Sequence, residues 1–117
     1  MAKIICKLVS GPMPSVDQVI LEVNSNSCGA ISVFQGVIRD QFQGKLVTHL
    51  FYECYEAMAM SKLEQISWEL AKEYSDLKGL AIYHKIGEVP VGFASVTIVA
   101  VSPHSKCALE VAAIAIE

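Results

Sequence analysis

Residues 57–86 read AMAMSKLEQISWELAKEYSDLKGLAIYHKI, and the spacing of their apolar side chains changes partway along. From residue 57 to residue 74 apolar side chains recur every three or four positions, at Ala59, Leu63, Ile66, Leu70 and Tyr74. This period predicts an amphipathic helix with one buried stripe. Residues 79–86 form a short apolar run that begins with glycine, which predicts a strand. A helix followed directly by a strand indicates a fold that mixes both kinds of element.

Working outward from this pair, the sequence predicts two more helices and four more strands. Ser15 and Gln18 have the spacing of a capping box and predict a helix over residues 16–23. The expected strands are 3–9, 29–38 (a buried strand), 46–55, 79–86 and 93–101, and the third expected helix is 105–117. We expect residues 40–45 to form a polar loop and residues 87–92 a turn-rich connection. This order predicts an α+β fold with a mixed or antiparallel sheet, not a doubly wound parallel sheet.

The composition fits one apolar domain spanning residues 1–117. The chain is 53% hydrophobic and 18% charged, with a mean hydropathy of +0.44. These values exclude an intrinsically disordered protein. The net charge of −3 excludes a nucleic-acid binder that works by bulk positive charge. Because a domain this small buries only part of its surface on folding, the apolar excess indicates a subunit interface.

No membrane span or leader peptide is expected. The longest stretch without a charge, residues 89–105, is shorter than the roughly 20 residues that a spanning helix needs. The four cysteines are Cys6, Cys28, Cys54 and Cys107, and they form no CxxC pair or metal-ligand cluster. We interpret them as structural thiols of a cytoplasmic protein, and we expect neither a bound metal nor a cofactor.

Two polar residues are candidates for chemistry. Arg39 is the only arginine and ends an expected strand, where its planar fork suits an anionic ligand; pairing with Asp40 at the surface is the alternative. His104 stands where a strand gives way to a helix, which suits proton transfer or an anion contact, although an ordinary loop histidine fits the same pattern. Convergence of the surrounding cations would create one cationic pocket: Arg39, Lys45, Lys85, His104 and Lys106.

Four ordered motifs resemble the large, catalytic subunit family of molybdopterin synthase. The segment GAISVFQGVIRD at 29–40 resembles the family's GA…F.G..R pattern. The others are LFYECY at 50–55 with Met58 and Ala59, HKIGEV at 84–89, and VSPH at 101–104 followed by ALE at 108–110. Together these motifs cover nearly the whole chain in the family's order.

The resemblance implies an α/β hammerhead-type fold, a homodimer and a small ubiquitin-like sulfur-carrier partner. That partner's C-terminal Gly-Gly thiocarboxylate would donate sulfur to cyclic pyranopterin monophosphate, and two transfers would form the dithiolene of molybdopterin. Arg39 and His104 match the family's catalytic residues. The implied substrate-binding residues are Val37, Ile38, Arg39, His104, Ser105 and Lys106.

The sequence departs from the family pattern at three places. Ser105 replaces the arginine that follows the histidine, with Lys106 next to it as a substitute. Lys85 replaces the arginine of the family's HRIG motif. The family continues its last helix into a segment K….P.WKKE that supplies catalytic lysines, so we expect this chain to be truncated at its C-terminus. The alternatives are an impaired member acting as a dimeric, partner-binding scaffold, and an apolar dimerisation domain that binds a small anion.

Overall fold

The computed structural model describes residues 2–42, 45–46, 49–52 and 56–115, and side chains are described outside residues 42–55. The main strands are β1 (Lys3–Val9), β2 (Ala30–Val37), β6 (Gly79–Lys85) and β8 (Ala94–Ser102). The helices are α1 (Val16–Val23), α2 (Glu56–Glu73) and α3 (Ser105–Ala115). Four short strands complete the described elements: β3 (Gln41–Phe42), β4 (Lys45–Leu46), β5 (His49–Tyr52) and β7 (Gly87–Pro90).

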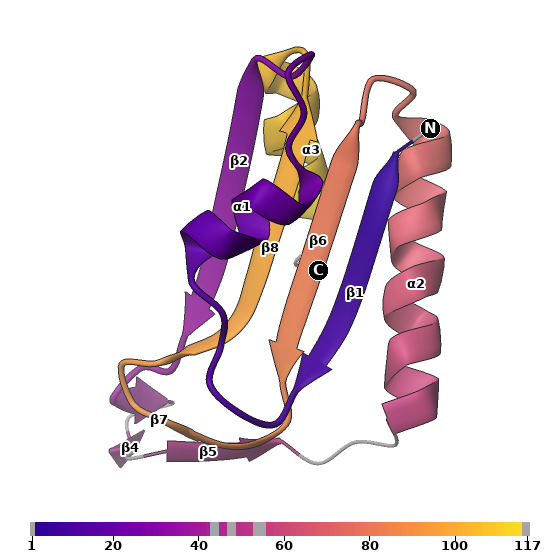
Figure 1. Cartoon of the computed structure of the whole chain (residues 1–117). Helices are drawn as coiled ribbons and strands as arrows, with labels where there is room; N and C mark the ends of the chain where they lie inside the picture. Colours follow the sequence, from indigo (N-terminus) through magenta and orange to yellow (C-terminus); the bar gives the residue numbers. More distant parts are fainter. Residues whose placement is uncertain (1, 43–44, 47–48, 53–55, 116–117) are drawn as a thin grey trace.

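The four main strands form one mixed sheet in the order β1-β6-β8-β2. β1 runs parallel to β6, while β8 is antiparallel to both β6 and β2. The parallel strands β1 and β6 are joined by a long crossover that includes α1, β2 and α2, whereas the antiparallel strands β6 and β8 are separated only by the short segment that contains β7. The predicted α+β class with a mixed sheet is therefore confirmed (Figure 1).

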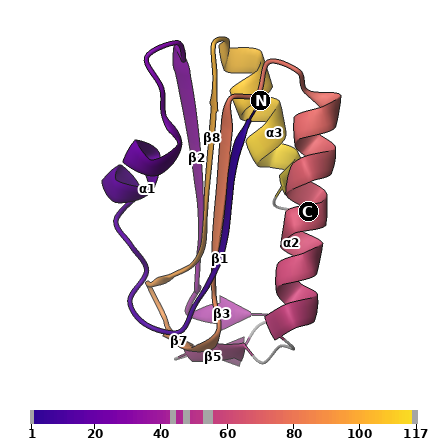
Figure 2. The same ribbon diagram turned by 45° about the vertical axis from the view of Figure 1, so that its right-hand side comes forward.

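Helices cover both faces of this sheet. α1 lies on one face, and α2 and α3 lie side by side on the other (Figure 2). Each face has its own hydrophobic core: Leu80, Ile82 and Ile98 pack toward α2 and α3, whereas Ala81, Val99 and Val101 pack toward α1. The alternation of side chains along β6 and β8 supplies both cores, which explains why these strands are almost continuously apolar.

The helices form where the apolar spacing predicts them. Ser15 caps α1, because its hydroxyl accepts a hydrogen bond of 3.2 Å from the backbone N–H of Gln18. α2 packs the predicted stripe against the sheet, with Leu70 buried and the other stripe residues partly buried. Ser67 is fully buried as well, and its hydroxyl donates a 2.8 Å hydrogen bond to the carbonyl of Leu63. α3 is described from Ser105 to Ala115, so the last two residues of the expected helix lie outside the described part.

Three of the sequence predictions for the middle of the chain are wrong. Residues 40–45 do not form only a loop, because β3 pairs antiparallel with β4. Residues 87–92 do not form only turns, because β7 pairs antiparallel with β5, and the positive φ angles of Gly87 and Gly92 bracket that strand. The expected strand over residues 46–55 is divided, since β4 pairs with β3 and β5 pairs with β7. Residues 47–48 and 53–55 of that strand, including Cys54, lie outside the described residues.

The expected burial of β2 is also wrong. Its residues alternate between partly buried and exposed, and Ile31, Val33 and Val37 are 44%, 40% and 49% exposed. β2 is an edge strand, and α1 packs on β8 and β6, so one face of β2 stays uncovered (Figure 1). The apolar sequence of β2 therefore reflects an exposed apolar surface.

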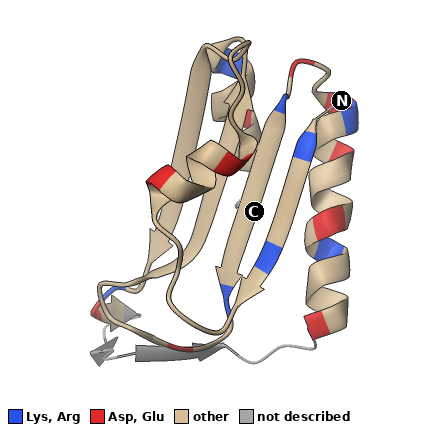
Figure 3. Ribbon diagram, viewed as in Figure 1, with Lys and Arg blue, Asp and Glu red and all other residues tan. Residues whose placement is uncertain are grey.

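The charged residues lie outside the two cores. Acidic residues stand on α1 and α2, and lysines mark the edge strand β1 (Figure 3).

The helices described in the structure include none with the length and apolar character of a membrane span.

Candidate functional site

Arg39 is held at the end of β2 by the backbone of its neighbour. Ile38 is buried, and its N–H donates to the carbonyl of Phe93 at 3.1 Å while its carbonyl accepts from the N–H of Gly92 at 2.9 Å. The ladder shifts register between Gly36 and Val37, immediately before this anchor. The guanidinium of Arg39 therefore projects from a fixed strand end with its side chain exposed.

His104 occupies the start of α3. Its N–H donates to the hydroxyl of Ser102 at 3.3 Å, and its carbonyl accepts from the N–H of Ala108 at 3.5 Å. His104, Ser105 and Lys106 are all exposed at this helix N-terminus. The unpaired N–H groups of a first helical turn favour anions, and Lys106 at the same place adds positive charge.

Gly29 brings the start of β2 against the strand-to-helix turn that carries His104. A Cβ atom at Gly29 would lie 2.9 Å from the carbonyl oxygen of Pro103. Such a contact is too short for any side chain, so glycine allows the two backbones to touch. The N-terminal end of β2 and the His104 turn consequently form one compact corner of the sheet.

Within one chain, Arg39 and His104 lie at opposite ends of the β2–β8 ladder. Ala30 pairs with Ser102, and Val37 pairs with Ala94. The eight residue steps from Ala94 to Ser102 correspond to about 27 Å at roughly 3.4 Å per residue. Val37 and Ile38 lie beside Arg39, and Ser105 and Lys106 lie beside His104, so the six predicted site residues form two groups.

The other two cations of the predicted pocket, Lys85 and Lys45, are not shown beside Arg39 or His104. Lys85 ends β6, and its ammonium donates to the carbonyl of Gly11. The Nδ1 atom of His84 is 2.7 Å from the carbonyl oxygen of Lys85. The side chain of Lys45 lies outside the described residues. One chain alone therefore does not gather these cations into a single pocket.

Two hollows described in the structure lie elsewhere, on either side of Trp68 of α2. None of the six predicted site residues lines them. Trp68 was not singled out by the sequence, although a tryptophan off the apolar stripe of an amphipathic helix is the pattern that marks an exposed contact residue.

The described residues provide no metal centre. No group of three or more His, Cys, Asp or Glu side chains among them is placed to hold an ion.

Cys6, Cys28 and Cys107 are free thiols. Burial raises the pKa of the Cys6 thiol, and the nearby Glu64 carboxylate acts in the same direction, against the hydrogen bond with Ser67.

Comparison with known proteins identifies relatives along most of the chain. Residues 10–117 match the model of the MoaE protein family. Over 95 residues the chain is 50% identical to molybdopterin synthase catalytic subunit 1 of Aedes aegypti, covering 81% of this chain and 61% of that protein. The chain thus spans less than two thirds of the length of this relative.

Solved structures show the same architecture. Molybdopterin synthase from Staphylococcus aureus superposes with a TM-score of 0.86 at 31% identity, over 93% of this chain and 78% of that one. A complex of subunits 1 and 2 of molybdopterin-converting factor from Helicobacter pylori shares the fold, with a TM-score of 0.73 at 21% identity over 95% and 74% of the two chains. From its sequence match and its fold, the chain belongs to the MoaE protein family.

Proposed function

We propose that this chain is the catalytic domain of a molybdopterin synthase, which transfers sulfur from a small carrier subunit to cyclic pyranopterin monophosphate. Family membership supports the activity, because relatives of this family are named as molybdopterin synthase catalytic subunits. The H. pylori complex of two subunits supports a small partner. The single observation that carries the proposal for the site is the pair of exposed cationic corners around Arg39 and His104.

The proposed reaction requires fixed positive charge and a proton donor, not a nucleophile of this chain. The carrier's thiocarboxylate sulfur forms a carbon–sulfur bond on the pterin side chain while a carbon–oxygen bond at the same carbon breaks, and the departing oxygen takes a proton. Water then attacks the acyl carbon, so that the acyl–sulfur bond breaks and the carrier leaves as a carboxylate. Substrate phosphate and thiocarboxylate are both anionic. Arg39 offers a planar fork to one of them, and His104 at the α3 N-terminus is the proton donor for the departing oxygen.

A dimer of the chain would bring Arg39 of one copy near His104 of the other. If two β2 strands lie antiparallel about a two-fold axis, the Arg39 end of one strand meets the start of the other, where Gly29 touches the turn that carries His104. Each dimer would then hold two sites. Every site would combine Val37, Ile38 and Arg39 of one copy with His104, Ser105 and Lys106 of the other.

The surface of β2 suits such a dimer. β2 reads AISVFQGV, an edge strand without a charged residue, so two copies approach without like-charge repulsion. Its exposed Ile31, Val33 and Val37 would gain apolar cross-strand neighbours on the same face of the joined sheet. An uncovered apolar edge strand is prone to aggregation, and a closed two-fold pairing removes that hazard.

The proposal is tested by measuring molybdopterin formed from cyclic pyranopterin monophosphate and the thiocarboxylated carrier. Two forms are assayed: the 117-residue chain, and the same chain extended at its C-terminus by a family segment that contains the lysines. Product from the extended chain supports the enzyme. If the extended chain binds the carrier and dimerises but gives no product, the chain is instead a partner-binding scaffold.

A further inference from the structure

We infer that the open edge of β1, together with Glu64 and Trp68 of α2, is a docking groove for an extended acidic segment of a partner protein. β1 pairs only with β6 among the strands that the structure describes, and it lies at the opposite edge of the sheet from β2. The groove is therefore separate from the proposed synthase site and from the proposed dimer contact.

The backbone of β1 offers hydrogen bonds along this edge. The N–H of Lys3 donates to the carbonyl of Lys78 at 2.9 Å, and the carbonyl of Val9 accepts from the N–H of Ile86 at 3.0 Å. The backbone N–H and C=O groups of the odd-numbered residues of β1 therefore point to β6. Because backbone groups alternate along a parallel strand, those of Ile4, Cys6 and Leu8 point to the open edge.

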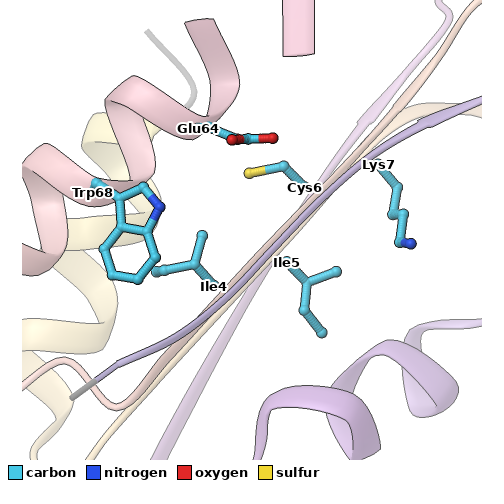
Figure 4. A pocket seen from close by; sticks show the side chains of 6 residues that line it. All are labelled: Ile4, Ile5, Cys6, Lys7, Glu64 and Trp68. Atoms are coloured by element: carbon cyan, nitrogen blue, oxygen red, sulfur yellow. The ribbon is translucent and has the colours of Figure 1, made fainter. Parts of the chain in front are cut away.

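A hollow lies directly beside these groups. Its volume is about 360 Å³, and Ile4, Ile5, Cys6, Lys7, Glu64 and Trp68 line it. In Figure 4 Ile4 and Cys6 point to the α2 side of the sheet, whereas Ile5 and Lys7 point to the α1 side. A second hollow of about 310 Å³ adjoins Trp68 near Ala2 and Leu77.

The wall of the groove is fixed in place. The thiol of Cys6 lies 3.3 Å from the hydroxyl of Ser67, which also donates to the carbonyl of Leu63. This contact ties β1 to α2 one residue before Trp68. Trp68 is 46% exposed, so its indole offers a large apolar surface on a rigid helix. Aromatic side chains placed in this way are typical of interaction hot spots.

The charges select the occupant. Lys3 and Lys7 are exposed on the α1 side of β1, four residues or about 13 Å apart, and β1 contains no acidic residue. Antiparallel pairing of two β1 strands would gather four lysines on one face, which disfavours a second copy of this chain. Edge lysines of this kind block unspecific pairing but attract a strand with carboxylates opposite them.

The groove consequently specifies a pattern. The incoming strand carries acidic residues four positions apart, facing Lys3 and Lys7. The residues next to each acid face α2, where Ile4 and Trp68 favour apolar side chains and Glu64 disfavours carboxylates. The occupant reads acidic–apolar–any–apolar–acidic and adds a strand to the sheet by β-augmentation.

A capped peptide of sequence TEVTVET tests this inference on the whole chain. Trp68 is the only tryptophan, so its fluorescence reports on the groove directly, and we expect a shift to shorter wavelength when the peptide binds. In amide hydrogen exchange, Ile4, Cys6 and Leu8 should gain protection, whereas Lys3, Ile5 and Lys7 should change little. This alternation distinguishes strand addition from adhesion to the surface.

Matched variants define the chemistry. The charge-reversed peptide TKVTVKT, in which both glutamates become lysines, should bind about tenfold more weakly than TEVTVET. The doubly substituted protein Lys3→Glu with Lys7→Glu should bind TEVTVET more weakly by a similar factor. Trp68→Ala, followed by anisotropy of a labelled peptide, should weaken it by about as much. Lys62→Glu and Leu21→Ala, exposed changes outside the groove, should leave it unchanged.

Equal affinity for the two peptides would overturn the inference, as would no binding at millimolar peptide to the folded protein. Protection of Ile4, Cys6 and Leu8 that rises with protein concentration in the absence of peptide would also overturn it, because β1 would then pair with a second copy.

Discussion

The phenol of Tyr83 on β6 donates a hydrogen bond of 2.5 Å to the Glu22 carboxylate on α1. Tyr83 is buried beneath α1 in the core of that face. Burial first, and then the hydrogen bond and charge of Glu22, raise the pKa of Tyr83 to about 12 from an ordinary value of 10.0. This hydrogen bond links α1 to a central strand of the sheet, in addition to the apolar packing of Val19 and Val23.

The Tyr83 contact predicts a loss of stability in alkali. Because the folded protein holds the phenol proton more tightly than the unfolded chain, its contribution is complete below pH 10 and falls as pH rises toward 12. Denaturant unfolding at a series of pH values checks this. Tyr83→Phe should cost about 1 kcal/mol at pH 7 and remove that part of the alkaline loss. Equal stability of the variant and the parent at pH 7 would contradict it.

Gly79 predicts a large packing effect. A Cβ atom there would lie 2.6 Å from the carbonyl oxygen of Val23 and 2.7 Å from a methyl carbon of Val101. Gly79→Ala must push α1 away from the sheet, so we expect a loss of about 2 kcal/mol in the free energy of unfolding. Gly11→Ala is the matched control, because nothing lies within 4 Å of its added methyl group. Similar effects of the two changes would show that the close approach is not needed.

Ser15→Ala tests the cap of α1. The change removes the acceptor for the N–H of Gln18 and should cost about 1 kcal/mol, measured by urea denaturation. Ser61→Ala, at an exposed position inside α2, should be neutral or slightly stabilising because alanine favours helix. A Ser15→Ala protein as stable as the parent would mean that packing alone holds α1.

Substitutions of Arg39 should separate the effect of its positive charge from the effect of its forked geometry on substrate affinity. Arg39→Ala should weaken binding of cyclic pyranopterin monophosphate about tenfold or more by calorimetry, because a bidentate charged contact is lost. Arg39→Lys should fall between the two, since it keeps the charge without the fork. Lys3→Ala should bind as the parent does, and equal binding by Arg39→Ala would exclude Arg39 from the site.

The sequence predicted the elements whose side chains repeat regularly. The spacing from Ala59 to Tyr74 defined α2, and the capping box at Ser15 defined the start of α1. It missed β7, because Gly87, Pro90 and Gly92 are turn residues; an edge strand nevertheless accommodates a terminal proline such as Pro90. Gly87, Pro90 and Gly92 do favour turns, but the pairing of β7 with β5 overrides this preference, and that pairing joins segments about forty residues apart that no local pattern connects.

The candidate site shows the same division. The residue types that suit an anion, Arg39 and His104, could be named from position and chemistry. Their separation depends on the antiparallel register of β2 and β8, a contact between segments about sixty residues apart in sequence. The exposure of Val33 on β2 was hidden for a related reason, since an apolar edge strand and a buried strand have the same composition.

The most direct test of the proposed synthase site is complementation between two inactive variants. Arg39→Ala and His104→Ala chains, both with the C-terminal extension, are co-expressed with different tags, and molybdopterin formation is measured with the thiocarboxylated carrier. A site shared between copies predicts that each variant alone is nearly inactive. The mixture should recover about a quarter of the parent activity, because half of the dimers are mixed and each has one intact site. No recovery from dimers shown to be mixed would contradict the shared site.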